Sequence, residues 1–123
     1  MTIMENKELQ QYIFELQKMQ IQFKFWHWQT KMFSKHEALC KIYDFLGEQI
    51  DEIAEIAMGK YGRVEVNDVA YSFVNFTEPE INNTIDTCIE NCIKLTEKLD
   101  SNRDTDLLNL RDEVLGKLNK TKY

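Results

Sequence analysis

Apolar residues recur at intervals of three and four positions along most of this 123-residue chain, which is the spacing of amphipathic helices. The first such segment runs from about Glu5 to Lys31. Its apolar positions are Leu9, Tyr12, Leu16, Met19, Phe23 and Trp26. We predict one long helix here, with Phe23 and Trp26 filling the core, because large aromatic rings on an apolar stripe usually pack inside.

A second helical segment is predicted from about Lys35 to Met58. Ser34 and Glu37 fit a capping box at its start, and Gly59 and Gly62 follow it as stop signals. Its apolar stripe consists of Leu39, Ile42, Leu46, Ile50, Ile53 and Ala57. A stripe of this width indicates a helix that packs one face against a core.

Two shorter helical segments complete the pattern. Thr77 and Glu80 fit a second capping box, with Pro79 in the first turn. The third segment then carries Ile81, Ile85, Cys88, Cys92, Leu95 and Leu99. After a turn over residues 101–105, a fourth helix is expected to begin near Asp104 or Thr105. Its apolar positions are Leu107, Leu108, Leu110, Val114, Leu115 and Leu118.

The connection between the second and third helices, Lys60 to Phe76, is long for a plain loop. Asn67 and Asp68 could cap a short extra helix over Val69 to Val74. The length of this connection predicts a crossover between the ends of a bundle, whereas the other two links are short. We therefore predict an all-α, ferritin-like four-helix bundle, with residues 1–123 forming one domain.

Composition excludes several other classes of protein. Hydrophobic residues are 43% and charged residues 29%, which is typical of a globular protein. The formal net charge of -6 gives no support for nucleic-acid binding, which usually needs a basic face. The N-terminus is polar, and no apolar run approaches the ~20 residues that span a membrane. Cys40, Cys88 and Cys92 make an odd count, which favours reduced thiols and a cytoplasmic location.

The candidate chemistry lies between residues 27 and 55. Both histidines of the chain, His27 and His36, fall there, on either side of a short turn. Asp51 and Glu55 follow at positions i and i+4, so they project from one face of the second helix. Imidazole and carboxylate groups are suitable ligands for iron, zinc or manganese. We therefore take these four residues as candidate metal ligands.

A helical wheel places the candidates of the second helix beside its apolar stripe. His36, Cys40, Asp51 and Glu55 fall at about 0, 40, 60 and 100°, whereas the stripe clusters near about 280°. Gly47 lies on the same flank. A flank with ligands and a small residue suits a second helix contact, such as a subunit interface.

Two familiar metal motifs are incomplete in this chain. Neither histidine has a glutamate three positions before it, so a self-contained di-iron site within one bundle is not expected. The run His36-Glu37-Ala38-Leu39-Cys40 has a cysteine where a zinc peptidase has its second histidine.

These residues resemble the signature of the Dps family, the ferritin-like mini-ferritins known as DNA-binding proteins from starved cells. The resemblance rests on His27-Trp28, Phe33 in the following turn, His36, and Asp51-x-x-x-Glu55 with Ala54 between. The helix lengths, the second connection and the run Asp104-Thr105-Asp106-Leu107-Leu108 extend it over nearly the whole chain.

The resemblance implies a bundle that assembles through two-fold dimers into a hollow dodecameric shell. The implied activity is that of a ferroxidase, which oxidises ferrous iron, with peroxide as the favoured oxidant, and stores the mineral inside the shell. The implied ligands are His27 and His36 of one subunit with Asp51 and Glu55 of its neighbour. Trp28 would lie beside this site and quench radicals.

Two features depart from the family pattern. The family usually has an acidic ligand four residues after the second histidine, where this chain has Cys40; Asp44 and Glu37 lie nearby on the wheel and could substitute. A thiolate is softer than a carboxylate and is redox-active, which affects the choice of metal. The turn between the histidines is also shorter than is usual.

Two other functions stay open. One is a DNA-protecting or DNA-compacting Dps-like protein. Within Met1 to Gln11 the only cationic side chain is Lys7, which Glu5 and Glu8 offset, so we expect weak or no DNA binding. The other is a structural oligomer in which Cys40 marks the loss of the metal site.

Overall fold

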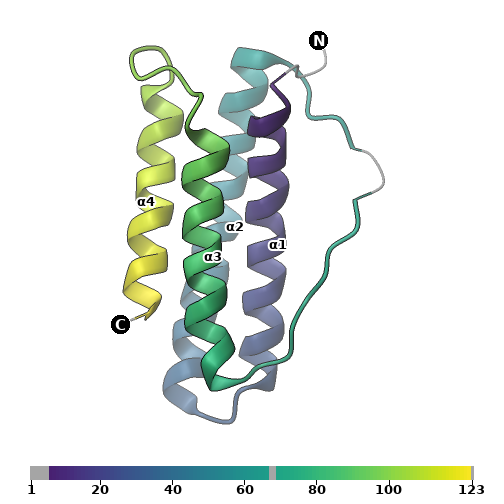
Figure 1. The fold of residues 1–123 in the computed structure, drawn as a ribbon, viewed down its shortest axis with the longest axis vertical. Coiled ribbons are helices and arrows are strands. Elements are labelled where there is room, and N and C mark those ends of the chain that lie inside the picture. Colours follow the sequence, from purple (N-terminus) through teal and green to yellow (C-terminus); the bar gives the residue numbers. More distant parts are fainter. Residues whose placement is uncertain (1–5, 67–68, 123) are drawn as a thin grey trace.

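The computed structural model describes residues 6–66 and 69–122, shown as a ribbon in Figure 1. Within these residues the helices are α1 (Lys7–Gln29), α2 (Phe33–Tyr61), α3 (Glu78–Thr96) and α4 (Thr105–Lys122). The prediction of an all-α four-helix bundle is confirmed. Of the helices just named, none is long and apolar enough to cross a membrane.

The helices form two antiparallel pairs, α1 with α2 and α3 with α4 (Figure 1). α1 packs against α2 and α3, and α4 packs against the same two helices. α2 and α3 lie on a diagonal of the bundle, because each packs against α1 and α4; an ion pair joins Lys35 at the start of α2 to Glu78 at the start of α3. The described parts of the link, residues 62–66 and 69–77, lie outside α1, the first near one end of the bundle and the second reaching the other end (Figure 1). The predicted long crossover between the second and third helices is therefore confirmed.

The core forms where the apolar stripes of the helices meet. Its buried residues include Leu9, Leu16, Met19, Leu39, Ile42, Leu46, Ile53, Ala57, Ile85, Leu107, Val114 and Leu118. Phe23 and Trp26 are fully buried as predicted, with ring centroids 5.8 Å apart. Each large side chain of this kind contributes roughly 1.5–3 kcal/mol by leaving water. Cys88 and Cys92 also lie in the core, where burial raises the pKa of both thiols to about 12.

The prediction of a short helix over Val69 to Val74 is wrong, because this part of the crossover is irregular and has no helical turn. Asn67 and Asp68, its predicted caps, lie outside the described residues. Gln22 of α1 donates a hydrogen bond to the Val74 carbonyl (3.0 Å) and accepts one from the Val74 amide (2.9 Å). Trp26 Nε1 donates to the same carbonyl (2.9 Å).

The hydrogen bonds of the crossover compete with helix formation. A helix needs the backbone amides and carbonyls of its own residues, and at Val74 side chains of α1 already bond to both groups. Gln29 continues the pattern, since its Oε1 accepts from the Phe76 amide at 2.7 Å. Gln10 does the same at the other end, where its Oε1 accepts from the Glu65 amide at 2.8 Å. The crossover is thus fastened along α1 by glutamine side chains.

α2 begins two residues earlier than predicted. Ser34 lies inside the helix, and the N-cap is Met32, which makes no side-chain cap hydrogen bond. The Met32 carbonyl already accepts a hydrogen bond from the His36 amide at 2.9 Å, so the helical ladder starts there. The capping box predicted at Ser34 is therefore wrong. Thr77 is the N-cap of α3 as predicted, but its side chain makes no cap hydrogen bond either.

Other helix ends differ from the predictions by a few residues. α2 runs through Gly59 and ends before Gly62, whose φ of 99° is a conformation that favours glycine. α3 ends at Thr96 and does not reach Leu99. α1 ends at Gln29, before the predicted limit at Lys31.

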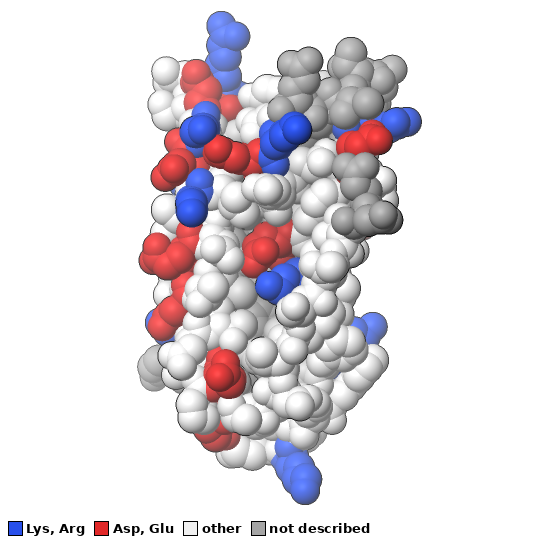
Figure 2. Space-filling model, turned by 45° about the vertical axis from the view of Figure 1, so that its right-hand side comes forward, with Lys and Arg blue, Asp and Glu red and all other residues white. Residues whose placement is uncertain are grey.

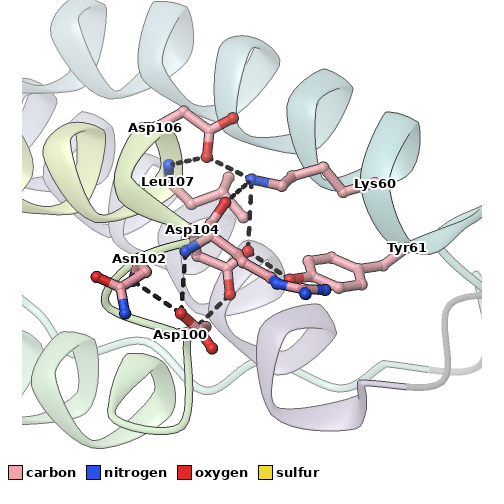
Figure 3. Close-up of polar contacts among 8 residues, drawn as sticks. Lys60, Tyr61, Asp100, Asn102, Asp104, Asp106 and Leu107 are labelled. Atoms are coloured by element: carbon pink, nitrogen blue, oxygen red, sulfur yellow. Dashed lines mark hydrogen bonds and ion pairs between the residues drawn. The ribbon is translucent and has the colours of Figure 1, made fainter.

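A polar network ties the C-terminal end of α2 to the α3–α4 turn (Figure 3). Asp104, only 2% exposed, accepts hydrogen bonds from the Asp100 amide (2.8 Å) and from the Tyr61 hydroxyl. Lys60 forms ion pairs with Asp104 (3.5 Å) and Asp106 (2.7 Å). These contacts fix the end of the bundle that lies away from the histidines.

Candidate metal site

His27 and His36 meet at the α1–α2 turn. His27 lies in the last turn of α1 and His36 in the first turn of α2, with the three residues 30–32 between the helices. The two rings are stacked, with centroids 3.6 Å apart and planes at 23°. His27 Nδ1 lies 2.7 Å from the His36 carbonyl, and His36 Nδ1 lies 2.9 Å from the His27 carbonyl. The structure therefore brings the two predicted histidines together.

The reciprocal hydrogen bonds assign the proton on each ring. A carbonyl oxygen only accepts, so each Nδ1 must carry a proton and donate it. In a neutral imidazole the other nitrogen, Nε2, then keeps its lone pair. Metal-binding histidines commonly show this arrangement, with one ring nitrogen held by a carbonyl and the other on the metal.

The end of α1 supplies the reason why this contact forms. The last four carbonyls of a helix have no partner within the helix, and the His27 carbonyl is one of them. His36 satisfies it from the adjacent helix. The short turn and the two hydrogen bonds together hold both rings against the backbone.

Tyr43 of α2 lies beside His27, and the Cys40 thiol contacts both Tyr43 and Asp44. Cys40 Sγ lies 3.7 Å from the Tyr43 hydroxyl oxygen and 3.7 Å from Asp44 Oδ2. The Tyr43 ring lies 5.2 Å from the His27 ring, centroid to centroid. The hydrogen bond between Cys40 and Tyr43 is the main cause that raises the pKa of the Tyr43 phenol above its ordinary value. Oxidisable side chains thus lie next to the imidazoles.

Trp28 lies on the outside of this region and is 64% exposed. Its ring is 5.6 Å from the ring of Phe25, and the Lys24 ammonium lies 5.9 Å from its centroid. The same ammonium lies 5.8 Å from the Tyr43 ring. The Lys24 ammonium thus lies near both the Trp28 ring and the Tyr43 ring.

Asp51 and Glu55 lie further along α2, both exposed to solvent. At a rise of about 1.5 Å per residue they are about 22 and 28 Å along the helix axis from His36. Within residues 6–66 and 69–122 no three side chains of His, Cys, Asp or Glu converge on one point. A single chain therefore brings the two histidines together with each other, but not with the two carboxylates.

Gly47 has a role within the chain. A Cβ atom at this position would lie 2.7 Å from Gln20 Nε2, and that side chain donates a hydrogen bond to the Tyr43 carbonyl at 3.3 Å. The absence of a side chain at Gly47 thus lets α1 reach the backbone of α2.

The contacts of Tyr43 with Cys40 and with the His27 ring were not predicted from the sequence. The signal was present in the spacing, because Cys40 and Tyr43 follow His36 by four and seven residues, which is the spacing of neighbours along one helical face. The reciprocal histidine hydrogen bonds left no such signal, because they depend on the path of the turn.

Figure 2 shows the face of the molecule that carries the crossover. Lys and Arg side chains are interleaved with Asp and Glu over the coloured residues, and no continuous basic surface is seen on this face. A basic surface is what binds the phosphate backbone of DNA, so this face offers no support for DNA binding.

The fold and the paired imidazoles define this protein as an all-α helical bundle with a two-histidine site at one end. The chain belongs to the family of unknown function DUF5856, whose match covers residues 27–123 and begins at His27. No curated protein and no solved structure matches the chain.

Proposed function

We propose that this protein is a ferroxidase and iron-storage bundle, in which two subunits together hold ferrous iron. His27 and His36 of one subunit supply the imidazoles, and Asp51 and Glu55 of a second subunit supply the carboxylates. Peroxide oxidises the iron, and an assembled shell of dimers holds the product.

The observation that carries this proposal is the pair of Nδ1 hydrogen bonds at 2.7 and 2.9 Å. They leave the Nε2 lone pairs of both rings for a metal, and they fix both rings before the metal arrives. Two imidazoles with carboxylate oxygens form a ligand set that suits ferrous iron.

The spacing along α2 supports a site between two copies. If α2 packs antiparallel to α2 of a second copy about a two-fold axis, a register that sets His36 opposite Glu55 also sets Cys40 opposite Asp51. The axis then falls between Asp44 and Gly47. At this point a hollow of about 590 Å³ lies between α1 and α2. Its lining includes Gln17, Gln20, Asp44, Gly47, Glu48 and Asp51.

Charge along α2 favours the same antiparallel arrangement. In the first part of the helix Lys35 and Lys41 are balanced by Glu37 and Asp44. The second part has an acidic excess, from Asp51, Glu52 and Glu55. A parallel pair would set the two acidic parts against each other, whereas an antiparallel pair sets each acidic part against the balanced part of the other copy, which avoids that repulsion.

The test is an anaerobic titration of the purified protein with ferrous iron, followed by a peroxide pulse read by absorbance. We expect His36→Ala and Asp51→Ala each to lower iron binding and oxidation at least about tenfold, as loss of a metal ligand does. Glu52→Ala is the matched control, because Glu52 is an exposed carboxylate beside Asp51 that faces another side of the helix.

Mixing the two inactive variants tests whether the site is shared. A dimer of one His36→Ala chain and one Asp51→Ala chain contains one site with both ligands intact and one site that lacks both. Unfolding and refolding the mixture should therefore restore iron oxidation that neither variant shows alone. Absence of iron binding by the parent protein, or binding unaffected by His36→Ala, would refute the proposal.

A further inference from the structure

We propose that Cys40 and Tyr43 become joined by a thioether bond when iron at the neighbouring histidine pair is oxidised by peroxide. This inference rests on the proposed function. It assigns a covalent modification to two residues of α2, between the cysteine sulfur and a ring carbon next to the phenol hydroxyl.

The two side chains already touch. Cys40 Sγ lies 3.7 Å from the Tyr43 hydroxyl oxygen. The ring carbons that would form the bond flank the carbon bearing that oxygen. The residues are three apart on one helix, where Cβ atoms are roughly 5–6 Å from each other. A cysteine sulfur and a tyrosine ring span that gap, so the bond can form without unwinding α2.

The pair also lies where oxidation would take place. The Tyr43 ring is 5.2 Å from the His27 ring, which is itself stacked on His36 at 3.6 Å. An electron taken from the phenol during iron oxidation therefore has a short path to the metal.

Cys40 has no thiol partner to form a disulfide within its own chain. Cys88 and Cys92 lie on α3, which packs against α1 and α4. Both are also buried in the core. The group beside the Cys40 sulfur that can react with it after oxidation is therefore the Tyr43 phenol.

The chemistry balances with peroxide as the oxidant. The S–H bond of Cys40 and one ring C–H bond of Tyr43 break, and one C–S bond forms. This oxidation releases two electrons and two protons, which reduce one hydrogen peroxide to two waters. Unlike a sulfenic acid, the thioether product is not returned to the thiol by reducing agents.

The cross-link would remove the reactive thiol from the site. A thioether sulfur cannot deprotonate, so position 40 would no longer offer a thiolate to a metal or to further peroxide. The hydroxyl of Tyr43 would be retained beside His27. Early turnovers would therefore convert a redox-active thiol into an inert sulfur.

Trypsin gives a direct test, because it cleaves after Lys41, between the two residues. The full-length protein is loaded with ferrous iron, given successive peroxide additions, reduced with dithiothreitol and digested. The expected product is the peptide of residues 36–41 joined to the peptide of residues 42–60, lighter than their sum by two hydrogen atoms. In denaturant, the number of thiols per chain should fall from three towards two.

Three variants make the result specific. Tyr43→Phe keeps the ring but lacks the phenol, and Cys40→Ser lacks the sulfur, so neither should yield the joined peptides. His36→Ala keeps both reacting residues and lacks an imidazole for iron, so its yield should fall at least tenfold. Iron oxidation is followed in the same samples by absorbance.

The outcomes separate this inference from the proposed function. Rapid iron oxidation without joined peptides would overturn the cross-link and leave the ferroxidase proposal standing. Equal yields in the parent and in His36→Ala would overturn the role of site-bound iron. Neither iron oxidation nor joined peptides in the parent would overturn both.

Discussion

Asp104 provides the strongest test of how the bundle is held at the end remote from the histidines. Its buried carboxylate accepts from the Asp100 amide at 2.8 Å and from the Tyr61 hydroxyl, and lies 3.5 Å from the Lys60 ammonium. Asp104→Asn keeps the size of the side chain and removes its charge. The amide oxygen can still accept from one of the two donors, but the NH2 group then faces the other, so one of the two hydrogen bonds must be lost or reversed.

The expected loss follows from these contacts. A hydrogen bond to a charged group contributes about 1.5–3 kcal/mol, so Asp104→Asn should lower the free energy of unfolding by about 2 kcal/mol. Domains of this size are stable by roughly 5–15 kcal/mol in total. The same loss should lower the melting temperature by about 6–10 °C.

The assay is urea unfolding followed by far-UV circular dichroism at one fixed protein concentration. Asp106→Asn is the control, because Asp106 pairs with Lys60 at 2.7 Å but its side chain is 48% exposed. An exposed ion pair contributes about 0–1 kcal/mol. If Asp104→Asn destabilises no more than Asp106→Asn does, the network does not hold this end of the bundle.

The network also predicts the pH dependence of stability. The hydrogen bond to Asp104 raises the pKa of Tyr61 above its ordinary value of 10.0. The contribution of this hydrogen bond to the free energy of unfolding is therefore full below pH 10.0. It is lost as pH rises through the higher pKa of Tyr61 in the folded protein. The amides of Asn102 and Arg103 lower the pKa of Asp100 below 3.8, so that contribution is lost only as pH falls below this value. Asp104→Asn should therefore weaken the fall in stability at alkaline pH and leave the fall in stability at acid pH unchanged.

Two further predictions test burial and the fastening of the crossover. In the native protein a thiol reagent should modify Cys40 alone, because Cys88 and Cys92 are buried with pKa values of about 12, and all three should react in denaturant; fast native reaction of three thiols would contradict this core. Gln22→Leu should speed hydrogen exchange at the Val74 amide at least about fivefold, because one hydrogen bond contributes about 1 kcal/mol or more. Gln17→Leu, at an exposed position of α1, should not, and equal exchange in both variants would show that Gln22 does not hold the crossover.

The helices could be predicted from the sequence because burial follows a regular period. Residues such as Leu16, Leu46 and Ile85 lie on stripes at steps of three and four, and all three are buried. The crossover could not be predicted in this way. Gln22 and Gln29 bind backbone groups of residues 74–76, and such contacts between a side chain and a distant backbone leave no period in either segment.

The start of α2 shows why capping signals are weaker than stripes. Ser34 and Glu37 fit a capping box, yet the helix begins at Phe33. A cap contributes about 1 kcal/mol, which competing contacts can exceed. Here the His36 ring bonds to α1, and the bond from the His36 amide to the Met32 carbonyl places Ser34 inside the helix.

The candidate site illustrates what helix geometry can and cannot decide. The wheel places His36 and Asp51 on one flank of α2, but it carries no information about their separation along the axis. A rise of about 1.5 Å per residue sets that separation at about 22 Å, which no side-chain rearrangement in one chain can close. The carboxylates can therefore join the histidines only across a contact with another copy of the chain. An iron site built from these residues therefore requires that two copies of the chain assemble. A variant that stays monomeric should lose iron oxidation although it keeps all four ligands.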